Sequence, residues 1–217
     1  MKKTIALAFS AVFMLTGCGK TLNISESIST GSSPSSQTDD SAFGGSFVIT
    51  LHPDVAPITC ENFEKLVNEG FYDGLTFHRV VEDFMAQGGD PLGTGMGGSE
   101  ETIKGEFSSN GVENNLSHKR GVVSMARSND PDSASSQFFI CYDDSCTFLD
   151  GNYAAFGEVT EGMTIVDDFL KVPRSLGGDG AVSSPDDLII MKKVVMIEDD
   201  ENGDPRVQIT MNDFLGE

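Results

Sequence analysis

The sequence has few basic residues for its number of acidic ones. It carries 14 Lys and Arg against 34 Asp and Glu, which gives a formal net charge of −20 at pH 7. A chain with this charge repels polyanions, so we expect no nucleic-acid partner. The acidity by itself indicates solubility and says nothing about the fold.

Residues that bind metals or form disulfides are also scarce. The three histidines lack the spacing of metal ligands, so we expect no metal site. Apart from Cys18 the chain has Cys60, Cys141 and Cys146, an odd number that allows at most one intramolecular disulfide. A bridge between the last two is conceivable, but buried free thiols agree with the sequence at least as well.

No apolar run at the N-terminus is long enough to cross a bilayer. The run Ile5–Leu15 follows Lys2 and Lys3 and is shorter than the roughly 20 residues of a membrane-spanning helix, which indicates a secretory signal over residues 1–18. It ends in Leu-Thr-Gly-Cys18, which resembles a bacterial lipobox. This resemblance implies lipidation at Cys18 and a location on the extracytoplasmic face of the cell membrane. The alternative is an ordinary secreted protein with Cys18 near its cleavage site.

The rest of the chain divides by composition into three parts. Residues 19–45 are rich in Ser and Thr and predict a flexible tether with a span of about 30 Å. Residues 46–198 suffice for one globular domain with its own core, which we expect to be monomeric. Residues 199–217 form an acidic C-terminal tail.

The globular part alternates between short strand patterns and two helical patterns. Pro57 favours a helix start and Gly70 a helix stop. Many short strands with two helices indicate a mainly β fold, a barrel with plugged ends. We expect strands over Ser46–Leu51, Leu75–Val81, Met85–Gly88, Gly121–Met125, Ser136–Cys141, Ala154–Val159 and Leu188–Ile197, and helices over Ile58–Asn68 and Met163–Leu170.

Two segments carry the most specific chemical pattern. Residues 77–90, Phe-His-Arg-Val-Val-Glu-Asp-Phe-Met-Ala-Gln-Gly-Gly-Asp, set a permanent cation and an amide among aromatic and thioether side chains. Residues 135–140, Ser-Ser-Gln-Phe-Phe-Ile, again set an amide among aromatics. Strand residues two apart share a face, which places Phe77 with Arg79 and predicts a common concavity. Its expected lining is Arg79, Met85, Gln87, Gln137 and Phe139, with Phe84 at the rim.

This combination offers no evident nucleophile or general base. Arginine keeps its proton at neutral pH, so the expected use of Arg79 is as an oriented donor and positive charge. Rotation about an X-Pro amide fits, because the twisted nitrogen regains a lone pair and the barrier of about 18–20 kcal/mol comes from resonance. No cofactor is needed. Taken alone, each apolar residue is more often core, Arg79 a surface ion-pair partner and each glutamine a satisfied hydrogen-bonder.

Together these residues resemble the cyclophilin peptidyl-prolyl cis-trans isomerases. Residues 77–90 and 136–140 are similar to two hallmark blocks of that family, and further ordered segments extend the resemblance over about residues 46–197. It implies a closed antiparallel eight-stranded barrel capped by two α-helices. It also implies an isomerase acting on X-Pro bonds of unfolded exported proteins and other proline-containing peptides.

The resemblance also implies roles for single residues. Arg79 and Gln87 would be catalytic. The residues implied to bind substrate are Phe84, Met85, Gly95, Ala126, Arg127, Ser128, Gln137, Phe139, Phe148, Leu149 and Tyr153. Phe148 and Tyr153 stand where many members have tryptophan and histidine, and loss of the indole N–H predicts weaker binding of the inhibitor cyclosporin. His78 alternates away from Arg79, so we expect a buried or half-buried ring with one hydrogen-bonded nitrogen.

The N-terminal edge of the domain departs from the family pattern. Cyclophilins usually have a strand before the one at Ser46–Leu51, whereas Ser35–Ala42 is polar and unpatterned. After a turn signal at Asn202–Pro205, however, Arg206–Met211 alternates cleanly. We expect this tail to fold back beside Leu188–Ile197, the alternative being a frayed terminus.

One alternative function remains open. A non-catalytic proline-peptide binding module or chaperone, tethered to the membrane, would keep the same pocket without needing turnover. A hydrolase is less consistent with the sequence, because no Ser, Cys or Asp comes with a base at a recognisable spacing.

Overall fold

The computed structural model describes residues 43–216. The expected signal peptide, Cys18 and most of the expected tether therefore lie outside the described residues. Residues 43–45, which composition assigns to the tether, belong to the first strand instead. None of the helices between residues 43 and 216 has the length and apolar character needed to cross a bilayer.

Within residues 43–216, eight strands form one antiparallel sheet in the order β2-β3-β5-β4-β6-β1-β10-β9, and two more form a separate hairpin. The strands of the large sheet are β1 (Phe43–Leu51), β2 (Thr76–Val81), β3 (Met85–Asp90), β4 (Val122–Met125), β5 (Phe138–Cys141), β6 (Ala155–Glu161), β9 (Met191–Ile197) and β10 (Arg206–Asn212). The hairpin consists of β7 (Arg174–Leu176) and β8 (Val182–Pro185). The helices are α1 (Pro57–Asn68), α2 (Met163–Asp168) and the 3-10 segments η2 (Ser108–Asn110), η3 (Asp144–Leu149) and η4 (Phe169–Lys171).

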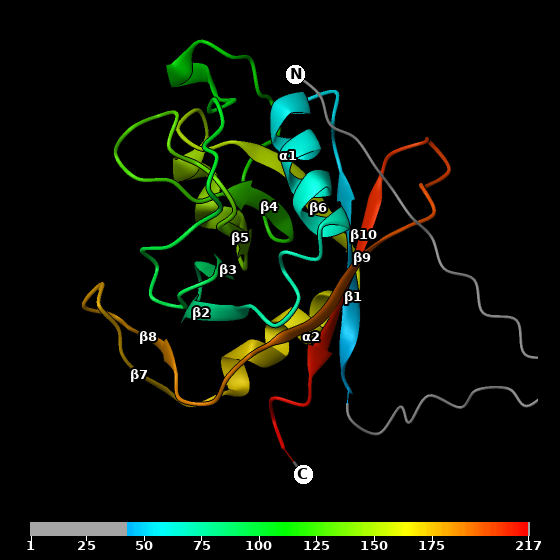
Figure 1. Cartoon of the computed structure of the whole chain (residues 1–217). Coiled ribbons are helices and arrows are strands. Elements are labelled where there is room, and N and C mark those ends of the chain that lie inside the picture. The colour runs from blue at the N-terminus through cyan, green and yellow to red at the C-terminus, as the bar shows by residue number, and fades with distance from the viewer. Residues whose placement is uncertain (1–42, 217) are drawn as a thin grey trace, which may run out of the picture. The chain divides into compact units, whose positions relative to one another are not determined.

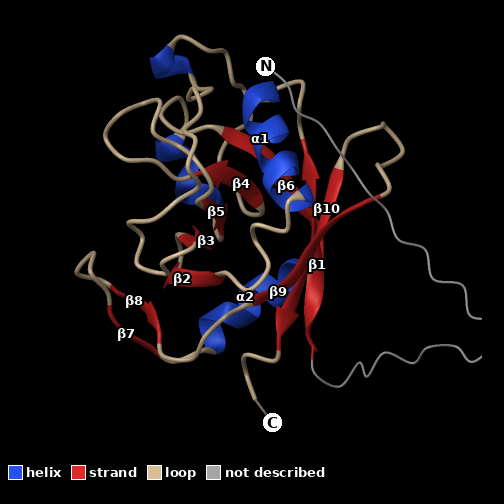
Figure 2. Ribbon diagram, viewed as in Figure 1, coloured by secondary structure: helices blue, strands red, loops and turns tan. Residues whose placement is uncertain are grey.

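The sheet curls so that the start of β2 and the start of β9, the two end strands, come within hydrogen-bonding distance through these ends and the residues just before them. The Phe77 N–H donates to the Ile189 carbonyl over 2.9 Å, and the Gly74 N–H donates to the Met191 carbonyl over 2.7 Å. In the view of Figures 1 and 2, α1 lies towards one end of the curled sheet and α2 towards the other. The predicted mainly β fold, with eight antiparallel strands and two α-helices, is confirmed, in the form of one curled sheet.

The interior is filled largely by aromatic rings. Phe63 of α1 lies 5.4 Å from Phe138 and 5.1 Å from Phe156 between ring centroids. Phe77 of β2 lies 4.8 Å from Phe169 of η4. All five rings are almost completely buried. Each such ring contributes about 1.5–3 kcal/mol through removal of apolar surface from water, so helix-borne rings hold both ends of the barrel closed.

A carboxylate from elsewhere in the chain caps the start of α1. Glu106 accepts hydrogen bonds from the Ile58 N–H at 3.1 Å, the Thr59 N–H at 2.8 Å and the Thr59 hydroxyl at 2.7 Å. The first N–H groups of a helix have no partner within the helix, and the helix dipole favours a negative charge there. This explains how Glu106 can be only 2% exposed.

The C-terminal tail forms the strand β10, which pairs with β9 on one side and β1 on the other. The expected position beside Leu188–Ile197 is thus observed, and β10 is also an interior strand of the sheet. Val207, Ile209 and Met211 alternate into the core and are each fully buried. The tail is therefore an integral part of the barrel and not an addition at its edge.

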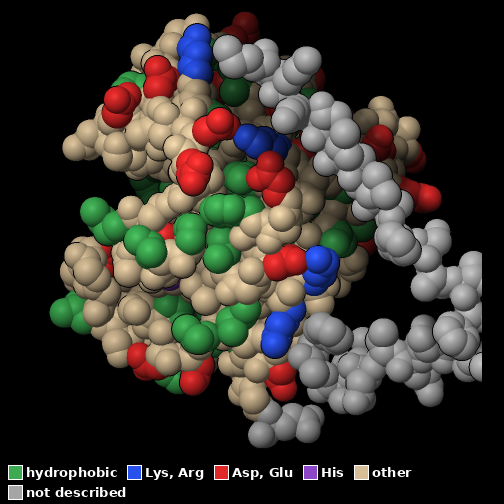
Figure 3. Space-filling view, in the orientation of Figure 1, with side chains coloured by type: hydrophobic (Ala, Val, Ile, Leu, Met, Phe, Trp, Pro, Cys, Tyr) green, Lys and Arg blue, Asp and Glu red, His purple; other side chains and the backbone are tan. Residues whose placement is uncertain are grey.

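Strand and α-helix boundaries lie close to the expected ones, but the β7–β8 hairpin and the 3-10 segments η2 and η3 were not expected. The β7–β8 hairpin was not predicted, because its short segments carry no clear alternation. The acidic side chains are spread over the face seen in Figure 3 and form no single patch there. This distribution agrees with solubility as the consequence of the negative charge.

Candidate active site

A small cavity of about 110 Å³ lies where β2, β3 and β5 meet η3 and the segment after β4. Its wall is made of residues that the sequence predicted to bind substrate. The lining residues are Arg79, Phe84, Met85, Gln87, Ala126, Arg127, Phe139, Leu149 and Tyr153.

A β-bulge aims Arg79 at this cavity. The register of β2 against β3 shifts between Phe77 and Arg79, so the two residues do not share a face as alternation predicted. Phe77 instead enters the barrel core, where it is 1% exposed. That prediction was wrong for Phe77, because strict alternation assumes a regular ladder and the extra residue, His78, breaks it.

The Arg79 guanidinium is held from several sides. Its Nε donates to Asp179 Oδ2 over 2.6 Å, and its Nη1 faces Gln87 Oε1 at 3.5 Å and Met85 Sδ at 3.7 Å. The ring of Phe84 lies 5.7 Å from the guanidinium carbon, within the range of a cation–π interaction. These contacts place a fixed positive charge at the rim of the cavity.

The floor of the cavity is apolar. Met85, Phe139 and Leu149 are 1%, 5% and 6% exposed and belong to one cluster with two cysteines. Tyr153 stands edge-on to Phe139, with ring centroids 5.8 Å apart. A compact apolar ring fits such a site better than a charged or extended group does.

Phe148 does not belong to the wall of this cavity. It is 66% exposed, and its ring packs against Phe84 with centroids 5.6 Å apart. The structure therefore places Phe148 at the outer edge, where it can meet only a ligand that extends beyond the cavity.

A second, wider cavity of about 370 Å³ adjoins the first and shares Gln87, Ala126 and Arg127 with it. Its remaining lining consists of Gly, Ser and Gln residues together with Met96, and it includes the three other predicted groove residues. These additional residues are Gly95, Met96, Gly97, Ser128, Ser133, Ser135 and Gln137. The two cavities thus form a small pocket with an apolar floor beside a wider groove of mixed polarity, as expected for a peptide site.

Arg127 is fixed as part of the wall between the cavities. Its guanidinium carbon lies 4.8 Å from the Tyr153 ring centroid and 5.0 Å from that of Phe107. Its N–H groups donate to the carbonyls of Asn152 and Ser128 over 2.8–3.0 Å. Arg127 is therefore held in place by the Tyr153 and Phe107 rings and by two backbone carbonyls, and it lines both cavities.

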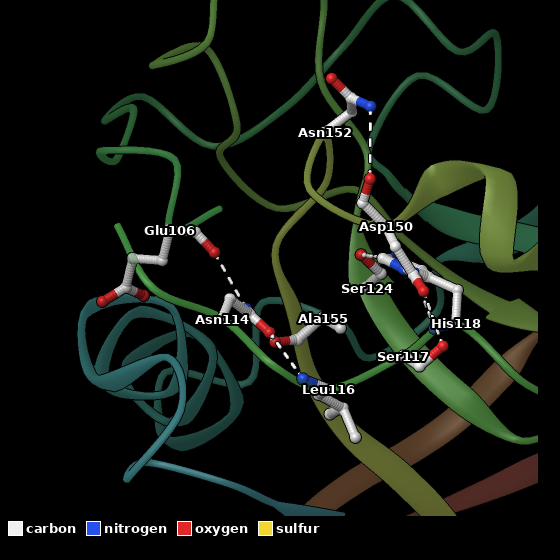
Figure 4. A network of polar contacts seen from close by, with 9 residues as sticks. All are labelled: Glu106, Asn114, Leu116, Ser117, His118, Ser124, Asp150, Asn152 and Ala155. Carbon is white, nitrogen blue, oxygen red and sulfur yellow. Dashed lines mark hydrogen bonds and ion pairs between the residues drawn. The ribbon is translucent and has the colours of Figure 1, made fainter. Parts of the chain in front are cut away.

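A Ser-His-Asp set lies next to Phe139, with Ser124 and His118 buried and Asp150 exposed. Figure 4 shows its polar contacts. His118 Nδ1 lies 2.8 Å from Asp150 Oδ1, His118 Nε2 lies 2.9 Å from the Ser124 hydroxyl, and the His118 ring stacks 6.1 Å from Phe139. The sequence offered no sign of this set. Because Ser124 is completely buried, no substrate carbonyl can reach its hydroxyl, and a support for Phe139 is the consistent role.

Burial and hydrogen bonding act in opposite directions on the pKa values of His118 and Asp150. Burial lowers the pKa of His118, although Asp150 acts in the other direction. Burial raises the pKa of Asp150, but hydrogen bonds from His118 and Ser117 outweigh it and leave this pKa below its ordinary value. We therefore assign a neutral His118 ring and an ionised Asp150 at neutral pH.

His78 differs from its prediction in one respect. The ring is half-buried as expected, but neither of its nitrogens has a hydrogen-bond partner among residues 43–216. Burial lowers the pKa of this ring, and the adjacent Arg79 charge lowers it further, against the opposing effect of Asp90. Burial and the Arg79 charge thus favour the neutral form of the His78 ring.

The three described cysteines are free and buried. Cys146 donates from its thiol to the Phe84 carbonyl at 3.2 Å, and with Cys141 it packs beneath Met85. Burial raises the pKa of the Cys146 thiol, so it is an unreactive packing group and not a nucleophile. Among residues 43–216 no group of three or more His, Cys, Asp or Glu is arranged to hold a metal ion.

Asp179 is a further residue at this site that sequence reasoning missed. It lies between β7 and β8, and 100 positions separate it from Arg79. The Gly-Gly-Asp-Gly run around it signals a turn, but a turn signal carries no information about the partner on another strand.

Comparisons with known proteins agree with this geometry. The chain matches the family described as "Cyclophilin type peptidyl-prolyl cis-trans isomerase/CLD" over residues 36–194. It is 48% identical over 120 residues to peptidyl-prolyl cis-trans isomerase B of Bacillus subtilis, covering 55% of this chain and 80% of that protein. It is 41% identical over 158 residues to a probable peptidyl-prolyl cis-trans isomerase of Brucella suis, covering 67% and 76%.

Solved structures lead to the same family. A Cryptosporidium parvum cyclophilin-type peptidyl-prolyl cis-trans isomerase, crystallised in the presence of the dipeptide Ala-Pro, superposes with a TM-score of 0.58 at 32% identity. The similarity covers 67% of this chain and 88% of that one. The strand β10 lies beyond the residues that match the family. On its fold, its cavity lining and these similarities, this chain belongs to the cyclophilin-type peptidyl-prolyl cis-trans isomerases.

Proposed function

We propose that this chain accelerates cis–trans rotation about X-Pro bonds in exported polypeptides and thereby assists their folding outside the cytoplasm. The observation that carries the proposal is the Arg79 guanidinium, fixed at the rim of an apolar cavity between Phe84 and Gln87. A proline ring can occupy the cavity while the peptide continues into the adjoining groove.

The proposed catalysis is electrostatic. As the X-Pro bond twists, its resonance is lost and the proline nitrogen becomes a hydrogen-bond acceptor. A guanidinium at the rim interacts more strongly with this nitrogen than with either planar form, and such a difference lowers the barrier. Because Arg79 keeps its proton, no proton transfer is required.

The apolar wall and the amides have a separate role. Met85, Phe139 and Leu149 fix the proline ring, so that rotation moves the preceding residue and not the ring. Gln87 is placed to hydrogen-bond a substrate carbonyl next to the ring, since its amide lies between Arg79 and Gln137. Fixing one side of a bond while the other turns removes much of the entropic cost of reaching the transition state.

The proposed location rests on the N-terminal sequence. A short apolar run followed by Leu-Thr-Gly-Cys18 is typical of a lipoprotein signal, and lipidation at Cys18 would tether the domain to the outer side of the cell membrane. The substrates encountered there are newly exported, unfolded chains, in which X-Pro isomerisation takes tens to hundreds of seconds. Replacing Cys18 with Ser is expected to release the protein into the soluble fraction. Full membrane association of C18S contradicts the anchor.

The decisive experiment measures X-Pro exchange in a short peptide by NMR, with and without the protein. Wild type is expected to accelerate exchange, and Arg79→Ala is expected to lose roughly 100-fold or more in kcat with a much smaller change in peptide affinity. Arg120→Ala is the matched control, because Arg120 pairs with Asp167 and does not line either cavity. Background rates for wild type together with retained peptide binding would leave only a non-catalytic binding module.

A further inference from the structure

The β7–β8 hairpin reaches the proposed active site through one side chain. Asp179, at the turn of the hairpin, places Oδ2 at 2.6 Å from Arg79 Nε. The side chains of Arg79 and Asp179 are 29% and 25% exposed, so the pair is partly shielded from water. Figure 1 shows the hairpin beside β2, the strand that carries Arg79.

The hairpin holds the Asp179 carboxylate before any substrate arrives. Oδ1, the oxygen that does not meet Arg79, accepts from the Ala181 N–H at 3.0 Å and from the Ser183 hydroxyl at 2.8 Å. Ser183 is itself only 2% exposed. Oδ1 thus accepts hydrogen bonds from within the hairpin, and Oδ2 accepts the one from Arg79.

Glycines permit this arrangement. A Cβ atom on Gly177 would lie 2.3 Å from the Ser183 hydroxyl and 2.9 Å from Asp179 Oδ1. Gly180 has a φ of 79°, which favours glycine. The Gly-Gly-Asp-Gly turn therefore allows the close approach by which the hairpin binds its own carboxylate.

The nitrogen atoms of the Arg79 guanidinium have different partners, and this indicates the role of the contact with Asp179. Nε is taken by Asp179, and Nη1 faces Gln87. Among residues 43–216 Nη2 has no hydrogen-bond partner, which leaves it available to a substrate. An arginine side chain is long and loses much rotamer freedom when fixed, so one strong charge-assisted bond at Nε limits how far the free end can move.

We propose that Asp179 is a positioning residue that fixes the Arg79 guanidinium in the orientation required for X-Pro rotation. The inference rests on the proposed function and assigns a catalytic purpose to the β7–β8 hairpin. Asp179 contacts Arg79 and lines neither cavity, so we expect its effect to fall on turnover and not on peptide affinity.

The Asp179 carboxylate is ionised at neutral pH. The hydrogen bond from Arg79 lowers the pKa of Asp179 to about 2, with further lowering by the Ala181 N–H and the Ser183 hydroxyl. The ion pair between Arg79 and Asp179 therefore persists around neutral pH and does not act as a pH switch.

The test compares Asp179→Ala and Asp179→Asn with Asp186→Asn. Asp186 is an exposed acid next to the same hairpin that pairs with Ser175 and does not contact Arg79. NMR exchange at saturating peptide measures kcat, and a peptide titration measures affinity. We expect D179A to lose roughly 10- to 100-fold in kcat with less than about twofold change in affinity, D179N to lie between D179A and wild type, and D186N to match wild type.

A second readout is independent of activity. In wild type and D186N, the Arg79 Nε–H resonance should be slow to exchange with water, because the bond to Asp179 protects it. In D179A and D179N this protection should decrease while the melting temperature stays close to that of wild type. An active wild type with unchanged kcat and unchanged Nε–H protection in D179A overturns this inference alone. An inactive wild type overturns the proposed function instead.

Discussion

The Gln87 carboxamide donates to Gln137 Oε1 over 2.8 Å, and Gln137 in turn donates to the Gly97 carbonyl over 2.7 Å. Two neighbouring strand segments and a glycine-rich loop are thereby joined in one chain of amides. Because Gln87 Oε1 also faces Arg79, this chain links the groove to the guanidinium.

Breaking the amide chain should lower turnover without unfolding the protein. Gln137→Leu removes both the acceptor for Gln87 and the donor to Gly97, and we expect about a tenfold loss in kcat/KM. Gln137→Glu keeps the acceptor and loses the donor, so a smaller loss is expected. The exchange assay and thermal melting measure the two effects. Equal activity of wild type and Q137L would show that Gln87 needs no support.

Phe148→Trp should tighten the binding of cyclosporin. The ring is 66% exposed at the outer edge of the pocket, so a larger ring is accommodated there, and an indole adds an N–H donor. One added hydrogen bond of about 1 kcal/mol corresponds to roughly fivefold in affinity. Inhibition titrations of both proteins measure the difference. Nanomolar inhibition of the native chain, unchanged in F148W, is the contrary outcome.

Acidification should destabilise the protein through its buried histidines. The pKa values of His78 and His118 are lowered chiefly by burial, so as the pH falls below about 6.5 the unfolded chain takes up protons first and gains stability relative to the folded one. His78→Leu removes one of these groups, along with two unpaired buried nitrogens. We expect a flatter melting profile between pH 7 and 5, and about 1 kcal/mol higher stability at pH 5. A profile as steep as that of wild type would assign the acid sensitivity to other groups.

Removal of the C-terminal strand should unfold the domain. A chain ending at Asp200 lacks Val207, Ile209 and Met211, each worth about 1.5–3 kcal/mol of burial against a total stability of about 5–15 kcal/mol. A chain ending at Phe214 keeps β10 and the contact of Phe214 with Phe169, and should melt near wild type. Circular dichroism on both truncations measures this. If the shorter chain melts at the same temperature as the full-length protein, β10 does not contribute to stability and the tail is a frayed terminus.

Local sequence patterns were sufficient for much of the site. Arg79, Met85, Gln87 and Phe139 come from two segments that each carry their own alternation, and antiparallel pairing of β3 with β5 brings the segments together. The alternation of Arg206–Met211 likewise predicted a strand from its own residues. These features depend on neighbours in sequence, where a period of two has direct physical meaning.

Other features exist only in the folded chain. The bulge at His78 turns Phe77 into the core and Arg79 outward, although nothing in their spacing distinguishes the two. The Arg79–Asp179 ion pair and the hydrogen bonds of His118 with Ser124 and Asp150 depend on the folded chain. No local sequence pattern encodes them. The sequence by itself therefore determined most of the side chains that form the pocket, with Phe148 as the exception that lies outside its wall. The tertiary structure decided how they are aimed and held, because orientation depends on contacts between segments that are remote along the chain.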